Sequence, residues 1–282
     1  MNFASECTEP VENYLEVSFD QITIRGRSIA GVETVLTIPE WNITFDAGRA
    51  PHFALSQDYL ALSHWHLDHA GGLPHFLSFR CLNSLPSLHI IVPPEKLKDA
   101  EDYLNCLKKV SSSELGYQLM TAEKGIALRK DLTLFTTPSY HCVPSNGYLV
   151  KSKKHKLKKE FQGKNPEEIV VLKKKGIEIT EEISGMPFSF SGDTRGDFLK
   201  TEAAKAYLFL MECTFFDDDV DEPSIQHYGH THIRDWRKHA ELIESPHVIM
   251  IHTSQRYSKK AIETACKKQL PKDLCDRLII FR

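Results

Sequence analysis

The sequence lacks the features of a membrane-spanning, disulfide-stapled or cysteine-ligated protein. No apolar run in its 282 residues is long enough to cross a bilayer, so we expect no membrane partner. Its seven cysteines are dispersed, odd in number and without a Cys-x-x-Cys pair. This pattern argues against a disulfide framework and against a cysteine zinc knuckle.

The N-terminal stretch MNFASECTEPVENYL also lacks the basic and apolar regions of a secretory signal. We therefore expect an intracellular, cytoplasmic protein. Charged residues make up 26% and hydrophobic residues 41% of the chain, which is the composition of a folded globular protein. Because the sequence has no internal repeat and no recognisable linker, we expect a single domain over residues 1–282.

Charge is distributed unevenly along the chain. The formal net charge is −3, yet residues 151–175 hold ten lysines against three glutamates. A basic segment on an otherwise acidic protein indicates an anionic partner, although a solvated lysine-rich loop would have the same composition. We interpret this lysine-rich segment as an insertion in the domain and not as a domain boundary.

Short apolar strands and helical segments follow one another over much of the chain. Two strands are predicted within residues 33–48, and a further strand at DYLALS runs directly into a histidine-rich turn. Later strands such as AYLFLMECT and HVIMIHT precede the helical segments THIRDWRKHAELIE and KKAIETACKKQL. Isolated His and Asp residues recur where these strands end.

The turn ALSHWHLDHAGGLPHF, residues 61–76, holds the densest group of metal-seeking side chains. His64 and His66 are two residues apart at the end of a strand, so both imidazoles can point the same way and bind one metal ion. Asp68 and His69 follow as the chain turns toward a helix, which offers them to a second ion nearby. Two metal sites need more ligands than these four residues.

Other strand ends supply candidates for the missing ligands. They are His141 in TTPSYHCVPSNGYLV, Asp193 in FSFSGDTRGDF and His252 in VIMIHTSQRY. A carboxylate can bridge two cations with its two oxygens, which suits Asp193 to a place between them. Asp46, in TFDAG, is better suited to hydrogen-bond a ligand histidine than to bind a metal itself.

These motifs resemble the metallo-β-lactamase superfamily and, within it, the short plant-type form of ribonuclease Z. SHWHLDH followed by GGL, a lone histidine, GDT and a late strand that ends in histidine carry the superfamily resemblance. Glu-x-Thr in MECTF, Gly-His-Thr in HYGHTHI, and HTSQRY favour the ribonuclease Z branch. The resemblance implies an α/β fold, an αββα sandwich in which two mixed β-sheets pack face to face with helices outside.

The resemblance also implies a role for each candidate residue. Two zinc ions are expected, although His and Asp ligands also tolerate Mn²⁺ or Fe²⁺. The implied ligands of the first ion are His64, His66 and His141. The implied ligands of the second ion are Asp68, His69 and His252. Asp193 would bridge the two ions.

The same resemblance implies catalytic roles for Asp68, Glu212 and His230. The implied reaction is removal of the 3′ trailer from precursor tRNA by a metal-dependent endoribonuclease, which leaves a 3′ hydroxyl on the tRNA and a 5′ phosphate on the trailer. Because a ribose 3′ oxygen is a poor leaving group, we expect His230, oriented by Glu212, to give it a proton.

Two alternatives stay open at this point. One is a metallo-hydrolase of a small phosphodiester, thioester or lactone, which the Glu212/His230 pair and the lysine-rich segment disfavour. The other is a catalytically silent RNA-binding protein on the same fold, which the complete set of ligands disfavours.

Many ribonuclease Z enzymes grip the tRNA elbow with a long Gly/Pro-rich arm, and no such arm is recognisable in this sequence. The lysine-rich segment occupies the corresponding place, between His141 and Asp193, as a candidate for a reduced version of the arm. The lysines expected to contact tRNA are Lys151, Lys153, Lys154, Lys156, Lys158 and Lys159. The resemblance also implies a homodimer.

Overall fold

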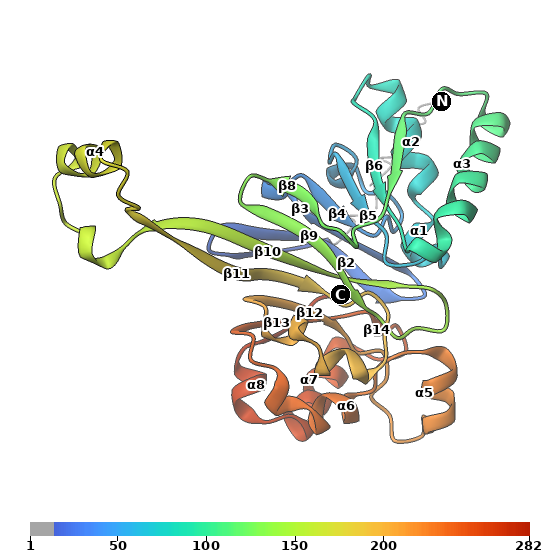
Figure 1. Ribbon diagram of the computed structural model, residues 1–282. Helices are drawn as coiled ribbons and strands as arrows, with labels where there is room; N and C mark the ends of the chain where they lie inside the picture. The colour runs from blue at the N-terminus through green and yellow to red at the C-terminus, as the bar shows by residue number, and fades with distance from the viewer. Residues whose placement is uncertain (1–13) are drawn as a thin grey trace, which may run out of the picture.

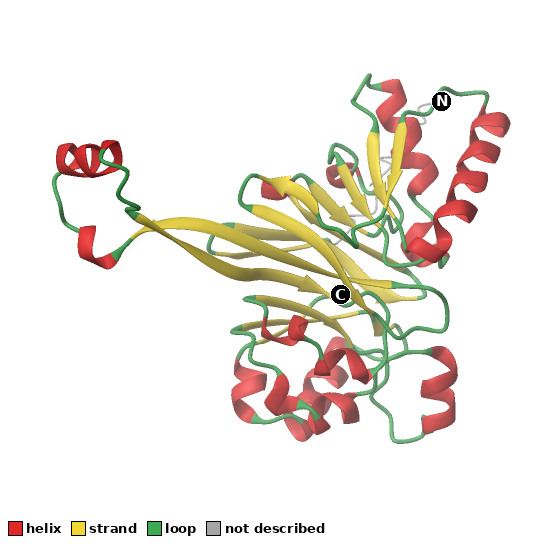
Figure 2. Ribbon diagram, viewed as in Figure 1, coloured by secondary structure: helices red, strands yellow, loops and turns green. Residues whose placement is uncertain are grey.

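The computed structural model describes residues 14–282; Cys7 and almost all of the stretch inspected for a secretory signal lie outside these residues. Two β-sheets pack face to face, and helices cover their outer surfaces (Figures 1 and 2). This is the αββα sandwich that the sequence predicted. Among the described residues no helix has both the length and the apolar character needed to span a membrane.

The first sheet follows the order β1-β2-β3-β4-β5-β6-β7, with β14 paired to β2. It is antiparallel from β1 to β4 and parallel from β4 to β7. Its strands are β1 (Leu15–Phe19), β2 (Ile22–Ala30), β3 (Glu33–Ile38), β4 (Ile43–Phe45), β5 (Tyr59–Ala61), β6 (Leu88–Ile91), β7 (Tyr117–Met120) and β14 (Thr253–Ser254).

The second sheet follows the order β15-β13-β12-β11-β10-β9-β8. Its strands are β8 (Ile126–Arg129), β9 (Leu132–Pro138), β10 (Asn146–Leu157), β11 (Thr180–Phe190), β12 (Leu208–Glu212), β13 (His247–Ile251) and β15 (Leu278–Ile280). The α-helices are α1 (Leu67–Ala70), α2 (Leu73–Leu82), α3 (Leu97–Ser111), α4 (Pro166–Lys174), α5 (Glu222–Tyr228), α6 (Ile233–Lys238), α7 (Lys259–Gln269) and α8 (Lys272–Asp276).

Strand alternation explains how the layers pack. In β12, Leu208 and Leu210 point into the core between the sheets, whereas Phe209 and Met211 point into a second core under helices α6, α7 and α8. Successive side chains of a strand lie on opposite faces, so a strand covered on both faces is apolar throughout. A third core lies between the first sheet and helices α2 and α3.

The candidate ligands follow strands that end at one edge of the sandwich. β11, β12 and β13 are parallel to one another, so their carboxyl ends meet there. β9 also runs in this direction, because both β9 and β11 are antiparallel to β10. The topology therefore brings together residues that are far apart in the sequence.

β10 and β11 continue past the sheet as a two-stranded arm that carries α4 at its tip (Figure 1). β9 pairs with β10 only as far as Ser152, and beyond that residue β10 pairs with β11 alone. The lysine-rich segment 151–175, the candidate for a reduced arm, lies in this projection, to which the outer half of β11 also belongs. The outer half of β10, KKHKL, has no buried face, so it lacks the apolar alternation by which a strand is recognised.

Candidate metal centre and active site

The side chains expected to bind metal converge at the edge where the strands end. They form two groups in which the potential ligand atoms lie within 4.8 Å of one another. The first group is His64, His66, His141 and Asp193, and the second is Asp68, His69 and His252. Asp193 Oδ2 lies 3.7 Å from His64 Nε2 and 3.3 Å from both His69 Nε2 and His252 Nε2, so this carboxylate reaches both groups.

A close approach between two loops positions the second group. Backbone N–H groups of Ala47 and Gly48 donate hydrogen bonds to the carbonyl of His69, at 2.6 and 3.1 Å. A Cβ atom on Gly72 would lie 2.6 Å from the carbonyl oxygen of Ala47, so glycine is needed for this packing. The contact also brings Asp46 Oδ2 to 2.7 Å from His69 Nδ1, the hydrogen bond predicted for Asp46.

Hydrogen bonds at Nδ1 turn the other ring nitrogen of these histidines inward. His69 donates from Nδ1 to Asp46, and His141 donates from Nδ1 to the carbonyl of Gly229 at 2.8 Å. A neutral imidazole has one N–H, so Nε2 of each ring keeps a lone pair for a metal. In His66 the other ring nitrogen faces the cluster: its Nδ1 lies 3.3 Å from His141 Nε2.

Several polar atoms in the cluster have no protein partner that satisfies them. His64 Nε2 and Asp193 Oδ1 are buried without a hydrogen bond to any described residue. His69 Nε2 and His252 Nε2 lie 3.2 Å apart, a distance at which either a shared proton or a metal ion must separate the two nitrogens. Imidazole nitrogens and carboxylate oxygens in this arrangement fit a divalent metal ion.

The electrostatics of the cluster keep its carboxylates ionised. Burial opposes the charge of Asp193, but His252 and His69 outweigh that effect and hold its pKa well below the usual range. For Asp68, too, burial is outweighed by the neighbouring His252 and His69, so its pKa is lowered. Burial, reinforced by the nearby His69, lowers the pKa of His64. Asp193 and Asp46 outweigh burial and raise the pKa of His69 well above its usual range, so a metal ion would displace a proton from this ring. The ionised carboxylates and His64 are already in the form that binds metals.

Glu212 and His230 form a separate pair beside the cluster. His230 Nδ1 donates to Glu212 Oε1 at 3.0 Å, and the same oxygen accepts from the backbone N–H of Thr194 at 3.0 Å. Trp236 Nε1 donates to the carbonyl of Glu212 at 3.1 Å and fixes its backbone. Burial disfavours a charge on His230, but Glu212 and Asp193 outweigh it and raise the pKa to about 9. His230 is therefore a cation at neutral pH.

His230 also belongs to a third group of potential ligands, with Asp193 and His252. Distance alone would thus allow it to bind a metal. In His230, unlike His69, Nδ1 is the ring nitrogen that lies near Asp193, 4.0 Å from Oδ2, and this atom already donates to Glu212 at 3.0 Å. This geometry suits a proton donor better than a ligand.

The six lysines expected to contact tRNA lie on the arm and at its base, away from the cluster. Three are in ion pairs with glutamates: Lys151 with Glu202 at 2.8 Å, Lys153 with Glu182 at 3.0 Å and Lys158 with Glu178 at 3.6 Å. Among the described residues no acidic partner lies within ion-pair distance of Lys154, Lys156 or Lys159. The sequence segment 151–175 therefore describes only part of the arm, because β11 adds acidic residues opposite it.

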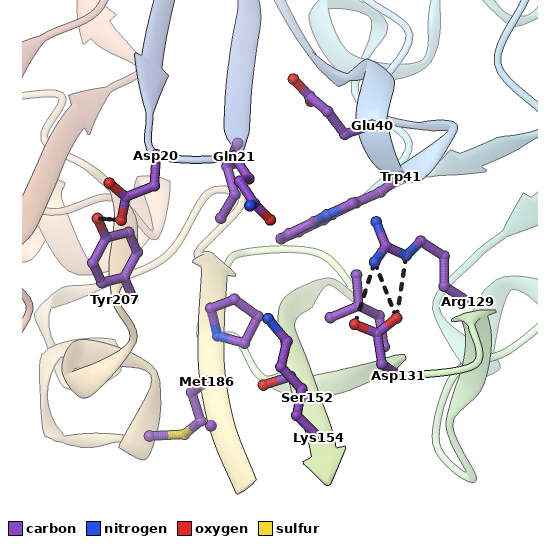
Figure 3. A pocket seen from close by; sticks show the side chains of 14 residues that line it. Asp20, Gln21, Glu40, Trp41, Arg129, Asp131, Ser152, Lys154, Met186 and Tyr207 are labelled. Atoms are coloured by element: carbon purple, nitrogen blue, oxygen red, sulfur yellow. Dashed lines mark hydrogen bonds and ion pairs between the residues drawn. The ribbon is translucent and has the colours of Figure 1, made fainter. Parts of the chain in front are cut away.

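A cavity of about 890 Å³ lies at the root of the arm, at the end of the sandwich away from the cluster (Figure 3). Trp41, Lys154 and Met186 are among its lining residues. Most of its charged groups are already engaged, as in the ion pair of Arg129 with Asp131. Its lining includes none of the candidate metal ligands, which lie at the other end of the sandwich.

Two residues beside the ligands were quoted in the sequence motifs without receiving a role. Ser63 precedes His64 in SHWHLDH, and Thr214 is the threonine of Glu-x-Thr in MECTF. Each hydroxyl lies within hydrogen-bond distance of a ligand histidine, at 3.0 Å for Ser63 and 3.2 Å for Thr214. The available signal was their position in the sequence: Ser63 precedes the candidate ligand His64, and Thr214 is two residues after Glu212.

Relatives of this chain include plant tRNases, although no family model matches the sequence. tRNase Z TRZ1 of Arabidopsis thaliana is 42% identical over 248 residues, which cover 86% of this chain and 89% of that protein. The chloroplastic tRNase Z TRZ2 of the same plant is 34% identical over 258 residues, covering 89% and 73%.

Solved structures agree on the fold. The metallo-β-lactamase fold protein YhfI from Bacillus subtilis superposes with a TM-score of 0.61 at 12% identity, covering 91% of this chain and 93% of that one. The short form of human tRNase Z (ELAC1) gives a TM-score of 0.56 at 18% identity, covering 82% and 92%. Given the identity to the plant proteins over most of both chains, this chain belongs to the tRNase Z family of hydrolytic nucleases, on the metallo-β-lactamase fold.

Proposed function

We propose that this chain is a metal-dependent endoribonuclease that removes the 3′ trailer of precursor tRNA, leaving a 3′ hydroxyl on the tRNA and a 5′ phosphate on the trailer. The observation that carries this proposal is a combination of groups at one edge of the sandwich. Two sets of His and Asp ligands share Asp193, and the cationic His230 is held beside them by Glu212 at 3.0 Å. Family membership supports tRNA as the substrate.

We assign zinc to both groups of ligands. Histidine-rich sets with one or two carboxylates suit Zn²⁺, while Mn²⁺ and Fe²⁺ accept the same ligands. When bound, two such ions supply a water of lowered pKa and neutralise charge that develops on the scissile phosphate. Elemental analysis should find about two ions per chain, since seven ligands exceed what one tetrahedral ion uses. One ion or none in active protein would reject the two-metal scheme.

Asp68 combines a ligand role with a catalytic one in this proposal. Its Oδ2 accepts a hydrogen bond from the backbone N–H of Gly31 at 2.8 Å and lies 3.5 Å from His252 Nε2. The side chain is 17% exposed, more than the side chains of His69, Asp193 and His252, so it faces the side that substrate can reach. As an ionised carboxylate it can accept a proton from the attacking water.

His230 acts as the general acid. Glu212 holds Nδ1, so the opposite ring nitrogen, Nε2, is the one available to the substrate. A proton delivered there to the leaving ribose 3′ oxygen avoids release of an alkoxide, which would be a poor leaving group. Glu212 therefore orients the ring and stabilises its charge.

The decisive experiment incubates the purified protein with a 3′-extended precursor tRNA and maps both product ends. Cleavage between the tRNA and its 3′ trailer is expected, with a 3′ hydroxyl on the tRNA and a 5′ phosphate on the trailer. A hydrolase of small substrates would leave the precursor intact, and a silent RNA-binding protein would bind it without cutting. Either result overturns the proposal.

The arm supplies the contact with the body of the tRNA. Precursor tRNA is a large polyanion, so an otherwise acidic protein needs a basic surface to hold it. Lys154, Lys156 and Lys159 offer ammonium groups that no described acidic residue neutralises. Lys151, Lys153 and Lys158 already face glutamates and contribute less.

A homodimer is a further part of the proposal. Large apolar side chains are exposed beside the cluster and on α3: Leu67 in α1 is 82% exposed and Val110 in α3 is 80% exposed. Exposed apolar groups of this kind suit a protein partner. Light scattering should give about twice the mass of the chain, and a monomer at micromolar concentration would contradict it.

We place the protein in the cytoplasm and treat residues 1–282 as one domain with the arm inserted in it. Relatives include a chloroplastic and a nuclear form, so a fluorescent fusion imaged in cells is the direct test of location. Limited proteolysis tests the domain proposal, because a single domain should lose the arm first and keep the rest of the chain together.

A further inference from the structure

We propose that the hydroxyl groups of Ser63 and Thr214 hold the ligand histidines His64 and His252 in the tautomer that turns Nε2 toward the metal. Both are positioning residues, because they act through a ligand and touch no reacting atom. The inference rests on the metal centre of the proposed function and adds to it the groups that orient one histidine in each set of ligands.

Ser63 connects His64 with a buried carboxylate. Its Oγ lies 2.8 Å from Asp46 Oδ2 and 3.0 Å from His64 Nδ1, and its backbone N–H donates to Asp46 Oδ1 at 2.7 Å. A hydroxyl has one proton to donate and lone pairs to accept with. Since the carboxylate takes the proton, the oxygen accepts from His64, which places the N–H of that ring on Nδ1.

Thr214 connects His252 with a second buried carboxylate. Its Oγ1 lies 2.8 Å from Glu212 Oε2, 3.2 Å from His252 Nδ1 and 3.0 Å from the His252 carbonyl oxygen. The hydroxyl can donate to only one oxygen, and an ionised carboxylate is a stronger acceptor than a carbonyl. With its proton on Glu212, Oγ1 accepts the Nδ1–H of His252.

The same arrangement thus occurs twice, once from each sheet. Asp46, Ser63 and His64 form one chain of hydrogen bonds, and Glu212, Thr214 and His252 form the other. Both hydroxyl-bearing residues are buried, so water cannot easily replace a deleted hydroxyl. Without that acceptor the imidazole can rotate or exchange tautomers, and its Nε2 is no longer fixed on the metal.

The carboxylate that Thr214 contacts also holds the general acid, whereas the carboxylate that Ser63 contacts does not. Glu212 accepts from Thr214 through Oε2 and from His230 through Oε1. One carboxylate therefore orients both a metal ligand and the general acid. Loss of the Thr214 hydroxyl should weaken metal binding and also loosen the position of Glu212.

The test compares Ser63→Ala and Thr214→Val with matched buried hydroxyls that touch no histidine. Ser189 donates to the carbonyl of Ala203 at 2.8 Å, and Thr37 lies 3.0 Å from Thr44, so Ser189→Ala and Thr37→Val are the controls. Zinc affinity of the full chain is measured by competition with a chelator. Groups that orient metal ligands typically change affinity by roughly 10- to 100-fold, and we expect losses of that size for Ser63→Ala and Thr214→Val alone.

Conservative rescue and a spectroscopic readout separate positioning from general destabilisation. Thr214→Ser keeps the hydroxyl and should bind zinc like the unmodified protein, while Thr214→Val should not. In ¹⁵N-labelled, zinc-loaded protein, the Nδ1–H signals of the bound histidines should be reduced by one in each weakened variant. If Thr214→Val binds zinc as tightly as Thr214→Ser, the positioning role is wrong, and trailer removal still stands. If the unmodified chain binds no metal, the metal centre itself is wrong.

Discussion

The two ends of β10 and β11 differ in nearly every physical property. At the cluster end, Asn146 and Phe190 are buried, and the backbone N–H of Asn146 donates to the carbonyl of Ser63 beside the ligands at 2.8 Å. At the arm end both strands leave the sheet, most side chains are exposed, and lysines face solvent or a neighbouring glutamate (Figure 1).

Under the proposed function the two ends have tasks that need different kinds of precision. Phosphodiester chemistry needs each ligand atom fixed to a fraction of an ångström, and burial with multiple hydrogen bonds provides that. Holding a large polyanion needs charge and reach, which flexible exposed lysines provide without fixed geometry. Changes at the cluster end should therefore damage every substrate, and changes on the arm should damage only a large one.

The largest effect is expected from Asp193→Asn. The variant keeps the size of the side chain but loses the charge that reaches both groups of ligands. Metal ions contribute several kcal/mol to a transition state, which corresponds to roughly 10³-fold or more in rate. Cleavage of precursor tRNA and of a small phosphodiester should fall together, and metal content should drop below about two ions per chain. Normal metal content with full activity would show that Asp193 is not the shared ligand.

His230→Ala should have the next largest effect. Loss of a general acid costs roughly 10²-fold or more in turnover. Metal content should stay near that of the unmodified protein, because Nδ1 of His230 is engaged by Glu212. Elemental analysis beside steady-state kinetics checks both statements. A variant that loses metal would make His230 a ligand, as its distance to Asp193 and His252 also allows.

The sequence was sufficient to predict which side chains come together at the cluster end. Seven side chains were named from the spacing in SHWHLDH, from strand ends elsewhere and from the resemblance to ribonuclease Z. The fold brings their potential ligand atoms together in two groups, within 4.8 Å of one another in each group. The resemblance also implied the sandwich, and strands covered on both faces, such as AYLFLM, were recognisable by their apolar runs. Ser63 and Thr214 were missed because a hydroxyl has no spacing rule that marks it as a hydrogen-bond bridge.

The arm end was predicted less well, for a physical reason. A strand with no buried face carries no alternation of apolar and polar residues, so KKHKL was not recognised as part of β10. Cross-strand pairing with β11 was invisible for the same reason, and with it Glu178 and Glu182, which neutralise Lys158 and Lys153. Composition predicted a basic surface, but only the register shows which lysines remain unpaired.

A matched pair of triple variants sharpens the comparison on the arm itself. Changing Lys154, Lys156 and Lys159 to Gln should weaken tRNA binding roughly tenfold and lower the salt slope of log affinity by about 2. Changing Lys151, Lys153 and Lys158 to Gln removes the same net charge and should have a smaller effect, since these ammonium groups already face glutamates. Affinity is measured across a salt series.

Hydrolysis of a small phosphodiester is the control for both triple variants and should be unchanged. Equal losses of tRNA affinity in both would mean that the RNA senses only the net charge of the arm. Unchanged affinity in both would leave the lysines as a solvated surface, the alternative that the composition allowed.

The smallest expected effect is a decrease of kcat at high pH, which depends on the cluster end alone. Glu212 and Asp193 overcome the effect of burial and raise the pKa of His230 to about 9. A general acid works only when protonated, so kcat should fall as pH rises through the pKa of His230, which cations bound beside Asp193 would lower from this value. In the proposed scheme the arm holds the tRNA and His230 does not, so KM for precursor tRNA should change little over the same range. In Glu212→Gln the carboxylate charge is gone and burial lowers the pKa of His230. The decrease of kcat should therefore move to lower pH. Profiles of kcat and KM from pH 7 to 10 for both proteins provide the test. A decrease of kcat that stays at the same pH in Glu212→Gln would be assigned to a group other than His230.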